Sequence, residues 1–301
     1  MYDVIIIGAG CTGFAAAMYS GRFKMKTLIL GELIGGLITW TDSVENYPGF
    51  NKITGQELAD KLRNHALEYK IDFKELRVAR IEKTKNGFNV YAKNQKFLGK
   101  TILFATGTEI KKLNVKGEGI LTNRGVHFCA LCDGYAYQNK IIAVVGGSDS
   151  AAKEALVLSN YGKKIYMIHR GNEIHPEPIN YEQIKNKKNI GIITNTNVLE
   201  INGKEKVESI TLDRPYKNSK QLKLDAVFVA IGHIPMSNMA KALGVKLNEK
   251  SEIIIDRESK TNIPGVFAAG DVADSKFKQA ITGVGEAVNA VYSAYEFINK
   301  K

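Results

Sequence analysis

The sequence predicts an α/β protein made of two three-layer domains, each with a central parallel sheet, the second inserted into the first. Three observations carry this prediction. Residues 3–30 and residues 141–168 each run as an apolar strand, a glycine-rich turn, a helix and a second apolar strand. The segment 264–286 returns to the style of the first unit, so we expect the chain to re-enter its first domain. With 301 residues, both domains are long enough to bury a core.

The first unit carries the pattern G-x-G-x-x-G between strand and helix. Its parts are the apolar run 3–7, the loop Gly8-Ala9-Gly10-Cys11-Thr12-Gly13, the helical stretch 14–22 and the apolar run 27–30. Gly8 permits the tight turn, Gly10 lets the backbone approach a pyrophosphate, and Gly13 lets helix and strand pack closely. The helix N-terminus favours an anion. Glu32 follows the second strand, where a carboxylate binds ribose hydroxyls. The unit is therefore Rossmann-like and predicts a dinucleotide site.

The second Rossmann-like unit has a poorer loop. Its parts are the apolar run 141–145, the loop Gly146-Gly147-Ser148-Asp149-Ser150-Ala151, a helix to about residue 160, the strand 164–168 and then His169-Arg170. Ser148 stands where the pattern has its second glycine, and a Cβ there crowds the approach of a phosphate. The candidate contacts of a nicotinamide nucleotide are Gly146, Gly147, Ser148, Asp149, Ser150, His169 and Arg170.

A C-x-x-C pair followed by an acid lies between the two units, at Cys129, Cys132 and Asp133. Two thiols at this spacing can close a small disulfide ring, which takes up two electrons when it opens to a dithiol. A structural zinc site normally needs four ligands, and the third cysteine, Cys11, lies far away in the first glycine loop. The pattern therefore predicts a redox pair and no metal.

The last segment contains a strand that ends in Gly270-Asp271 and a helix that opens after Lys278-Gln279-Ala280. Asp271 at a strand end can accept a hydrogen bond from a ribityl-type hydroxyl. The backbone amides at the start of the final helix can face a flavin carbonyl or a pyrophosphate. Taken alone, this segment is explained better as a turn followed by a capped helix.

Composition and charge narrow the classes of function. The composition, 44% hydrophobic and 24% charged, is that of an ordinary soluble protein, and no apolar run reaches the roughly 18 residues of a membrane span. The N-terminus lacks a signal-peptide pattern, so we expect a cytoplasmic protein. The net charge is +11, but the sequence contains no nucleic-acid-binding motif. The positive charge forms either a solvated basic surface or a surface that attracts an acidic protein partner.

Together these motifs resemble the low-molecular-weight thioredoxin reductases, in family order over the whole chain. The matching motifs are Gly8-Ala9-Gly10 with Gly13, VENYPGF at 44–50, Ala105-Thr106-Gly107, CALCDG at 129–134, VAIG at 229–232, PGVFAAGD at 264–271 and Lys278-Gln279-Ala280. The C-x-x-C-D-G motif inside the second domain is the specific one. The others are shared with further flavoproteins that bind two dinucleotides.

The resemblance implies an FAD domain at 1–112 and 236–301 and an inserted NAD(P)H-type domain at 113–235. It implies a homodimer in which the inserted domain rotates, so that the disulfide meets either the flavin or thioredoxin. By position, Cys132 would face the flavin, Cys129 would attack the substrate disulfide, and Asp133 would protonate the departing thiolate. The implied FAD contacts are Gly8, Gly10, Cys11, Thr12, Gly13, Glu32, Gly36, Leu37, Asn46, Ala105, Thr106, Gly107, Gly270, Asp271, Lys278, Gln279 and Ala280.

Three departures from the family pattern concern the nucleotide sites. Cys11 replaces a proline, and Ser148 breaks the second glycine motif. In the family pattern H-R-R-x-x-x-R, which binds the 2′-phosphate of NADP, Gly171 and His175 take two of the three arginine places and only Arg170 remains. Losing two guanidinium groups removes charge-assisted contacts to that phosphate. We therefore expect an electron donor other than NADPH.

The sequence thus predicts an FAD-dependent thioredoxin-disulfide reductase whose donor is reduced ferredoxin or NADH. The alternatives are a conventional NADPH-dependent thioredoxin reductase and a non-enzymatic flavin-binding relay module. A ferredoxin–NADP reductase is disfavoured because that group lacks the C-x-x-C pair. The flavoprotein of a peroxide-reducing system shares the motif but carries an extra N-terminal region, whereas here the first loop begins at Gly8.

Overall fold

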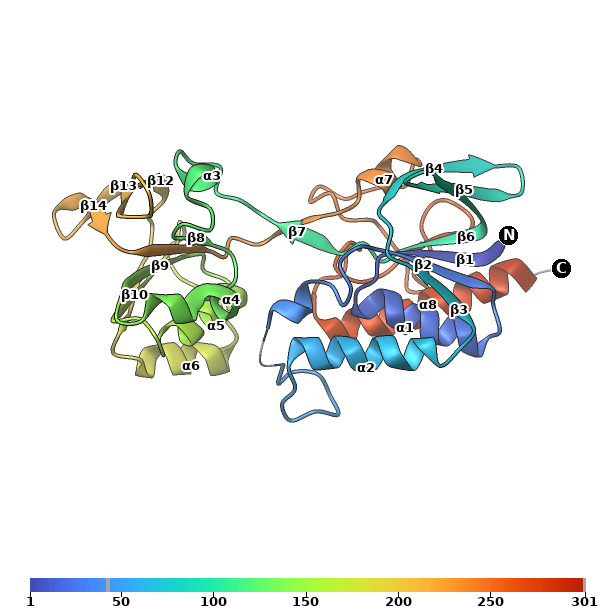
Figure 1. Cartoon of the computed structure of the whole chain (residues 1–301), viewed down its shortest axis with the longest axis horizontal. Helices are drawn as coiled ribbons and strands as arrows, with labels where there is room; N and C mark the ends of the chain where they lie inside the picture. Colours follow the sequence, from blue (N-terminus) through green and yellow to red (C-terminus); the bar gives the residue numbers. More distant parts are fainter. Residues whose placement is uncertain (42–43, 300–301) are drawn as a thin grey trace. The chain divides into compact units, whose positions relative to one another are not determined.

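The computed structural model describes residues 1–41 and 44–299. The chain divides into two compact units, one formed by residues 1–109 with 234–301 and the other by residues 110–233 (Figure 1). Both units are α/β structures with parallel strands, which confirms the predicted fold class. Each unit is described by itself below.

The first unit is built on a seven-stranded sheet of order β3-β2-β1-β6-β5-β4, with β17 also pairing with β6. Its strands are β1 (Tyr2–Ile7), β2 (Thr27–Leu30), β3 (Ile71–Lys74), β4 (Val78–Thr84), β5 (Gly87–Ala92), β6 (Gln95–Phe104) and β17 (Val266–Ala268). The pairs among β3, β2, β1, β6 and β17 are parallel, while β6, β5 and β4 pair antiparallel. The carboxyl ends of β1, β6 and β17 therefore meet at one edge, where ligands bind in such sheets.

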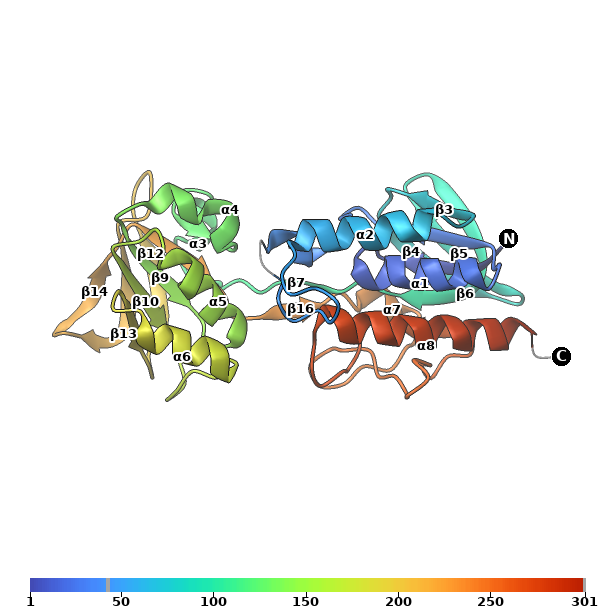
Figure 2. The same cartoon turned by 90° about the horizontal axis from the view of Figure 1, so that it is seen from below.

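Three long helices of the first unit lie along the sheet (Figure 2). They are α1 (Cys11–Arg22), α2 (Gly55–Leu67) and α8 (Ala280–Asn299). The unit also contains the short helices η1 (Leu37–Trp40) and α7 (Asn238–Ala242). Helix α1 packs against both α2 and α8. Its buried face consists mainly of small residues, so it can approach β1 and α8 closely. Helix α2 begins with a capping box between Thr54 and Glu57.

The second unit is built on a five-stranded parallel sheet of order β11-β10-β9-β15-β8. Its strands are β8 (Val126–His127), β9 (Ile141–Val145), β10 (Lys164–Ile168), β11 (Ile190–Ile193) and β15 (Ala226–Val229). A three-stranded antiparallel sheet adds β12 (Val198–Asn202), β13 (Ser209–Tyr216) and β14 (Ser219–Lys223). The helices are α3 (Glu118–Leu121), α4 (Ala130–Asp133), η2 (Gly134–Tyr137), α5 (Asp149–Leu158) and α6 (Pro178–Asn186).

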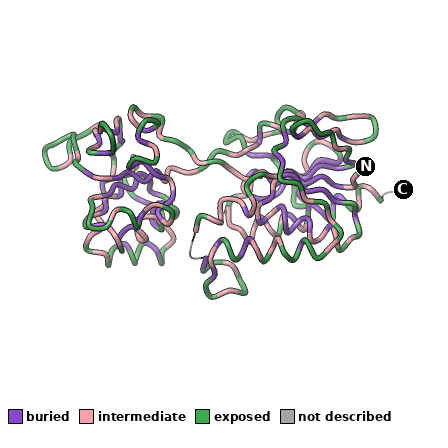
Figure 3. The backbone as a smooth tube through the Cα atoms, viewed as in Figure 1, coloured by how far each residue is buried: buried purple, intermediate pink, exposed green. Residues whose placement is uncertain are grey.

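The buried residues of each unit gather on its central strands (Figure 3). Strands β2 and β15 are buried at every position, and they read as unbroken apolar or near-apolar runs because both faces of a parallel sheet are covered. Where the chain passes between the units, β7 (Thr108–Ile110) pairs with β16 (His233–Pro235). Within residues 1–41 and 44–299, every helix is too short or too polar to cross a membrane.

Candidate active site

The first glycine loop, residues 8–13, is shaped by two glycines that have no room for a side chain. Gly8 has φ +120°, and a Cβ there would lie 2.1 Å from the carbonyl oxygen of Ala105. A Cβ on Gly13 would lie 2.0 Å from the carbonyl oxygen of Gly8. Gly10 differs, because a Cβ there would meet no atom of the described chain closer than 3.7 Å. Its lack of a side chain leaves space beside the backbone, as the approach of a pyrophosphate requires.

The start of helix α1 can receive an anion. Gly10 is its N-cap, no side chain caps it, and its first turn contains no acid. The free N–H groups and the helix dipole therefore favour a negative ligand. Cys11 follows the cap, and burial raises the pKa of its thiol to about 11. The thiol stays neutral and adds no negative charge at the position where an anion would bind.

Residues far apart in the sequence meet beside this loop. A Cβ on Gly270 or on Gly283 would lie 2.6 Å from Oγ1 of Thr12. The three residues are therefore packed together, at the start of α1, the end of β17 and the first turn of α8. The backbone N–H of Gly270 donates to Oε2 of Glu286 at 2.8 Å, which holds the turn in place.

Lys278 and Gln279 organise the segment before helix α8. Nζ of Lys278 donates to the carbonyl oxygens of Asp271 at 2.8 Å and Ala273 at 2.5 Å, and lies 3.0 Å from a carboxylate oxygen of Glu252. The side chain of Gln279 accepts from Nδ2 of Asn46 at 2.8 Å. The Lys278 ammonium group therefore holds the carbonyl groups of residues 271 and 273 close together. The Gln279 side chain links this segment to the loop that contains Asn46.

The remaining predicted FAD residues surround the same edge or mark its borders. Thr106 donates through Oγ1 to the carbonyl oxygen of Met236 at 2.8 Å, and Gly107 accepts from the amide of Met236 at 3.0 Å. Gly36 is the N-cap of η1, which begins at Leu37. Glu32 is exposed at the end of β2, 3.9 Å from Arg77. This edge of the first unit fits a dinucleotide, since its loop has space beside Gly10 and its helix has free amides.

The Cys129–Cys132 pair is a closed disulfide in the second unit, with Cα atoms 5.4 Å apart. Cys129 is the N-cap of α4 and is buried, whereas Cys132 is exposed. The amide of Cys132 donates to Sγ of Cys129 at 3.2 Å. A backbone donor at this position can stabilise negative charge that develops on Sγ of Cys129 during an exchange reaction.

Four polar side chains lie around the disulfide turn. Asp133 ends helix α4, and His127, two residues before Cys129, contacts it at 3.1 Å between Nδ1 and Oδ2. Nε2 of His127 lies 2.7 Å from the hydroxyl of Tyr137. Oε2 of Glu154 accepts from the amide of Ala130 at 2.6 Å. Burial raises the pKa of Glu154 to about 7, so this carboxyl titrates near neutral pH.

The second glycine loop, residues 146–151, is partly covered by its own chain. A Cβ on Gly147 would lie 2.4 Å from the ring of His169, and one on Gly171 would lie 2.7 Å from the same ring. The amide of His175 donates to the carbonyl oxygen of Gly147 at 2.7 Å, and His175 pairs with Ser148 as a β-bridge. Arg170 beside His169 is exposed.

A carboxylate occupies the start of helix α5. Asp149 accepts from the amide of Glu177 at 2.8 Å and from Nδ2 of Asn180 at 2.7 Å, and it pairs with Lys153 at 2.8 Å. Burial alone would raise the pKa of Asp149, but the bonds from Lys153, Asn180 and the Glu177 amide outweigh it and lower the pKa. Its charge opposes an anionic phosphate at this helix start, so the second loop fits a nucleotide less well than the first.

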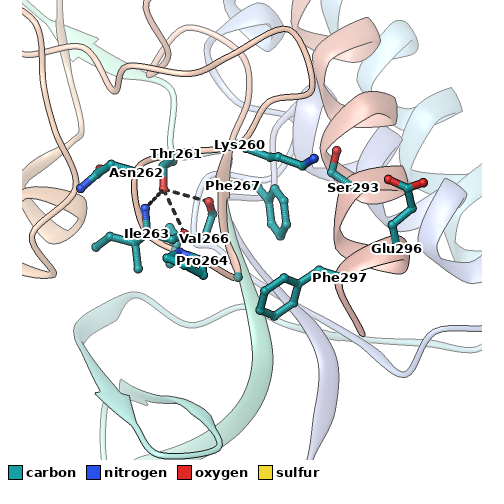
Figure 4. A pocket seen from close by; sticks show the side chains of 11 residues that line it. Lys260, Thr261, Asn262, Ile263, Pro264, Val266, Phe267, Ser293, Glu296 and Phe297 are labelled. Atoms are coloured by element: carbon teal, nitrogen blue, oxygen red, sulfur yellow. Dashed lines mark hydrogen bonds between the residues drawn. The ribbon is translucent and has the colours of Figure 1, made fainter. Parts of the chain in front are cut away.

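Two pockets lie outside the glycine loops and the disulfide. One, of about 270 Å³, is lined by the turn 260–267 and by Ser293, Glu296 and Phe297 of α8 (Figure 4). Figure 4 shows the side chain of Thr261 bonded within that turn, with the rings of Phe267 and Phe297 close by. The other, of about 440 Å³, is lined by residues 45–51 and includes Asn46. The first pocket contains no predicted site residue.

Comparison with known proteins decides the family. The sequence profile of the pyridine nucleotide-disulphide oxidoreductases matches residues 2–292. The chain belongs to this family. A thioredoxin reductase of Lactococcus lactis superposes with a TM-score of 0.94 at 34% identity, over 99% of both chains. A ferredoxin-flavin thioredoxin reductase of Clostridium acetobutylicum superposes with a TM-score of 0.54 at 28% identity, covering 100% of this chain and 99% of the other.

The curated relatives are longer than this chain. A component of the alkyl hydroperoxide reductase of Staphylococcus epidermidis is 36% identical over 300 residues, 99% of this chain, but the match spans only 59% of that protein. The structural likeness confirms the resemblance to the low-molecular-weight thioredoxin reductases. Membership of the pyridine nucleotide-disulphide oxidoreductases places the chain among the flavoprotein disulfide oxidoreductases and implies FAD and a pyridine nucleotide.

The sequence motifs did not identify the polar side chains around the Cys129–Cys132 disulfide, apart from Asp133. His127 interrupts an apolar strand run, which was a signal for a buried polar site. Glu154 lies three residues after Ala151 and one before Ala155, both on the buried face of α5, so a charge on that face could also have been noticed. Tyr137 and Glu286 gave no such signal, because their contacts depend on tertiary packing.

Proposed function

We propose that the chain is an FAD-dependent thioredoxin-disulfide reductase. Electrons would pass from a donor to FAD, then to the Cys129–Cys132 disulfide, and finally to the disulfide of a thioredoxin-like protein. The observation that carries this proposal is the closed disulfide at the start of α4, in a chain whose first glycine loop fits a dinucleotide. The FAD domain would be 1–112 with 236–301 and the inserted domain 113–235, in a cytoplasmic homodimer.

The chain's own residues would perform a dithiol–disulfide exchange. FAD, when bound, supplies the two electrons that open the Cys129–Cys132 disulfide to a dithiol. The Cys129 thiolate attacks one sulfur of the partner's disulfide, so a mixed disulfide forms as the partner's S–S bond breaks. Asp133 protonates the departing thiolate. Cys132 then attacks Sγ of Cys129, which re-forms the disulfide and releases the partner's second thiol.

A redox titration tests this path. Anaerobic reduction of the FAD-loaded protein with dithionite should consume two electrons for the flavin and two more for the disulfide. The Cys132→Ser variant should consume only the flavin's two electrons. In the Cys129→Ser variant, the flavin should reduce normally but pass nothing on to thioredoxin. If Cys129 and Cys132 stay oxidised while the flavin is reduced, the chain is a flavin-binding relay module instead.

The donor we propose is reduced ferredoxin or NADH rather than NADPH. Asp149 places a negative charge at the start of α5, and His169 and His175 lie against the loop where the pyrophosphate of either nucleotide would approach, which favours ferredoxin over both. Only Arg170 remains of the three basic places expected for a 2′-phosphate. Ferredoxin is favoured further because one structural relative is named as a ferredoxin-flavin thioredoxin reductase. The net charge of +11 suits an acidic protein donor.

A steady-state assay with each donor decides this point. Turnover with reduced ferredoxin should exceed turnover with NADPH and should fall as salt rises, because charge steers the encounter. NADH is the matched control, since it lacks only the 2′-phosphate. Turnover with NADPH as fast as with ferredoxin would make the protein a conventional NADPH-dependent thioredoxin reductase.

A second candidate function concerns the electron acceptor. The curated relatives are named as components of an alkyl hydroperoxide reductase, so the dithiol could serve the disulfide of a peroxide-reducing protein. Presenting the reduced enzyme with thioredoxin and with the peroxidase partner of such a relative separates the two acceptors. We expect thioredoxin to be reduced faster, since the match to the thioredoxin reductase of Lactococcus lactis covers 99% of both chains.

A further inference from the structure

A buried histidine connects two polar groups behind the redox disulfide. His127 ends strand β8 and is 6% exposed. Phe228 of β15 stacks on its ring with centroids 5.2 Å apart, and Tyr137 approaches edge-on at 5.4 Å. The ring is therefore held in one orientation, with Nε2 at the hydroxyl of Tyr137 and Nδ1 at the carboxylate of Asp133.

Nδ1 of His127 lacks a well-directed hydrogen bond in the described part of the chain. Oδ2 of Asp133, 3.1 Å away, is the acceptor within reach, and the half-exposed Asp133 side chain has room to adjust toward it. A buried N–H left unpaired costs free energy, so a small rotation of the Asp133 side chain that completes this hydrogen bond is favoured. The contact between His127 and Asp133 therefore links the Asp133 side chain to strand β8.

The tautomer of His127 follows from its two neighbours. Burial and then the charges of Asp133 and Asp225 raise the pKa of Tyr137, so its hydroxyl stays protonated and can donate to Nε2. Burial lowers the pKa of His127, against the opposing effect of Asp133, so the ring is neutral. With Nε2 accepting from Tyr137, the hydrogen is on Nδ1, the ring nitrogen that lies 3.1 Å from Oδ2 of Asp133.

The other titratable group near Asp133 comes from helix α5. Burial, helped by the charge of Asp133, raises the pKa of Glu154, and its Oε2 is engaged by the amide of Ala130 at 2.6 Å. Glu154 therefore does not compete for Nδ1 of His127.

We propose that His127, held in its Nδ1–H tautomer by Tyr137, is the positioning residue that orients the Asp133 carboxyl for proton transfer at the redox dithiol. The inference rests on the disulfide reductase function proposed above. The Cys129 thiol passes its proton to Asp133 as its thiolate attacks, and Asp133 passes that proton to the thiolate that leaves the partner. His127 remains neutral throughout, so no proton is gained or lost by the ring.

The test compares two disulfides that differ in their need for a proton. The FAD-loaded protein is reduced with stoichiometric dithionite and mixed with 5,5′-dithiobis(2-nitrobenzoic acid) or with bis(2-hydroxyethyl) disulfide. The aryl thiolate is a good leaving group without protonation, whereas the alkyl thiolate is more basic and benefits from an acid. His127→Phe keeps the ring stacked on Phe228 but removes both nitrogens. His127→Asn places an amide N–H near the position of Nδ1, and exposed His65→Asn is the matched control.

His127→Phe should slow reduction of the alkyl disulfide by roughly tenfold or more, because a positioned general acid contributes about 10²–10⁴ in rate. Reduction of the aryl disulfide should change by less than about twofold, and His127→Asn should restore most of the alkyl rate. Equal slowing of both disulfides would show that the ring is only structural, and no slowing of either would equally overturn the inference.

Two further outcomes separate this inference from the proposed function. Should His127→Phe fail to fold, Tyr137→Phe removes a single hydroxyl and must slow reduction of the alkyl disulfide selectively in the same way. If the wild-type protein takes electrons into its cysteines yet reduces neither disulfide, the reductase function itself fails, and the inference fails with it. If the wild type reduces both and the variants match it, only the role of His127 is refuted.

Discussion

The two glycine loops share a backbone and differ in what faces it. Gly8 and Gly146 both have positive φ, +120° and +152°. A Cβ on Gly8 would lie 2.1 Å from the carbonyl oxygen of Ala105, and a Cβ on Gly146 would lie 2.2 Å from that of Ala230. The turn from strand to helix thus needs glycine in both units for the same steric reason.

The next glycine position separates the loops. Gly10 and Ser148 are both helix N-caps with almost the same dihedrals, φ −83° and ψ −175° against φ −84° and ψ 176°. Each pairs by a β-bridge with a returning segment, Gly10 with Gly35 and Ser148 with His175. Side chains are absent from both partners in the first loop and present on both in the second. Because the backbone dihedrals are the same, the turn does not require glycine at one position or serine at the other. The difference therefore reflects what each loop binds.

The helices that follow also differ in charge. Helix α1 contains no acid, whereas α5 begins with Asp149 and places the partly buried Glu154 beside the disulfide turn. Backbone geometry thus follows from the fold, whereas the side chains around each loop determine what the loop can bind. Four variants test this difference, beginning with the largest expected effect.

The Gly8→Ala variant should lose FAD and unfold readily. Its Cβ would overlap the carbonyl oxygen of Ala105, and φ +120° strains any residue other than glycine. Together these effects should cost about 3 kcal/mol or more of the free energy of unfolding. Thermal unfolding and the bound-flavin absorbance measure both losses. Gly146→Ala is the matched control: it should lose similar stability, and an equal loss of flavin from it would contradict the division of roles between the units.

The Glu154→Gln variant should be more stable than the wild type above pH 7. The carboxyl has a pKa of 4.5 ordinarily and about 7 when folded, so stability falls as pH rises through this window. The shift corresponds to about 3 kcal/mol at most, and glutamine can still accept from the Ala130 amide. Denaturant unfolding between pH 4 and pH 8 checks this. Glu182→Gln, an exposed change on α6, should leave the pH dependence unaltered; parallel curves for Glu154→Gln and wild type would refute the prediction.

The Gly10→Ala variant should fold normally but bind FAD about tenfold more weakly, equivalent to about 1.4 kcal/mol. Its φ of −83° suits alanine, and the nearest atom to a Cβ on Gly10 would be the carbonyl oxygen of Gly35, 3.7 Å away. Its thermal midpoint without flavin should match that of the apo wild-type protein. The measurement is a flavin-fluorescence titration of the apo proteins. Unchanged affinity would mean that the space beside Gly10 is not used by a ligand.

Repair of the second loop should give the smallest effect. The Ser148→Gly, Asp149→Asn double variant removes the Cβ and the charge while Oδ1 can still accept from Glu177 and Asn180. We expect a few-fold gain in NADPH-dependent turnover, limited because His169 still lies against Gly147. Steady-state kinetics with NADPH measure it, and Glu182→Gln controls for the change of charge. A fall in NADPH turnover would show that the present loop already suits the nucleotide.

The sequence predicted the fold class because its signals are local. The apolar runs at 3–7 and 141–145 became parallel strands, and the glycines after them became the turns that such strands need before a helix. The contact of Thr12 with Gly270 was beyond reach, because these residues are 258 positions apart and meet only through the pairing of β17 with β6. His127 and Asp133 are near in sequence, but their contact depends on the short helix α4 turning the chain back.

The exposure of the two cysteines was likewise not predictable. Cys129 is buried and Cys132 exposed in this structure, although the resemblance assigns attack on a protein disulfide to Cys129. A spacing motif specifies which sulfurs can join, but the packing of α4 against α5 decides which one meets solvent.

The packing of Gly270 and Gly283 on Thr12 has a consequence for the order in which the protein is made. Residues 110–233 form one compact unit and are all present once residue 233 has left the ribosome. The first unit still lacks β17 and α8 at that moment, so Gly270 and Gly283 cannot yet pack against Thr12 at the start of α1. Because domains fold as units during synthesis, the inserted unit, with its cysteines, matures before the cofactor edge of the unit that encloses it in sequence.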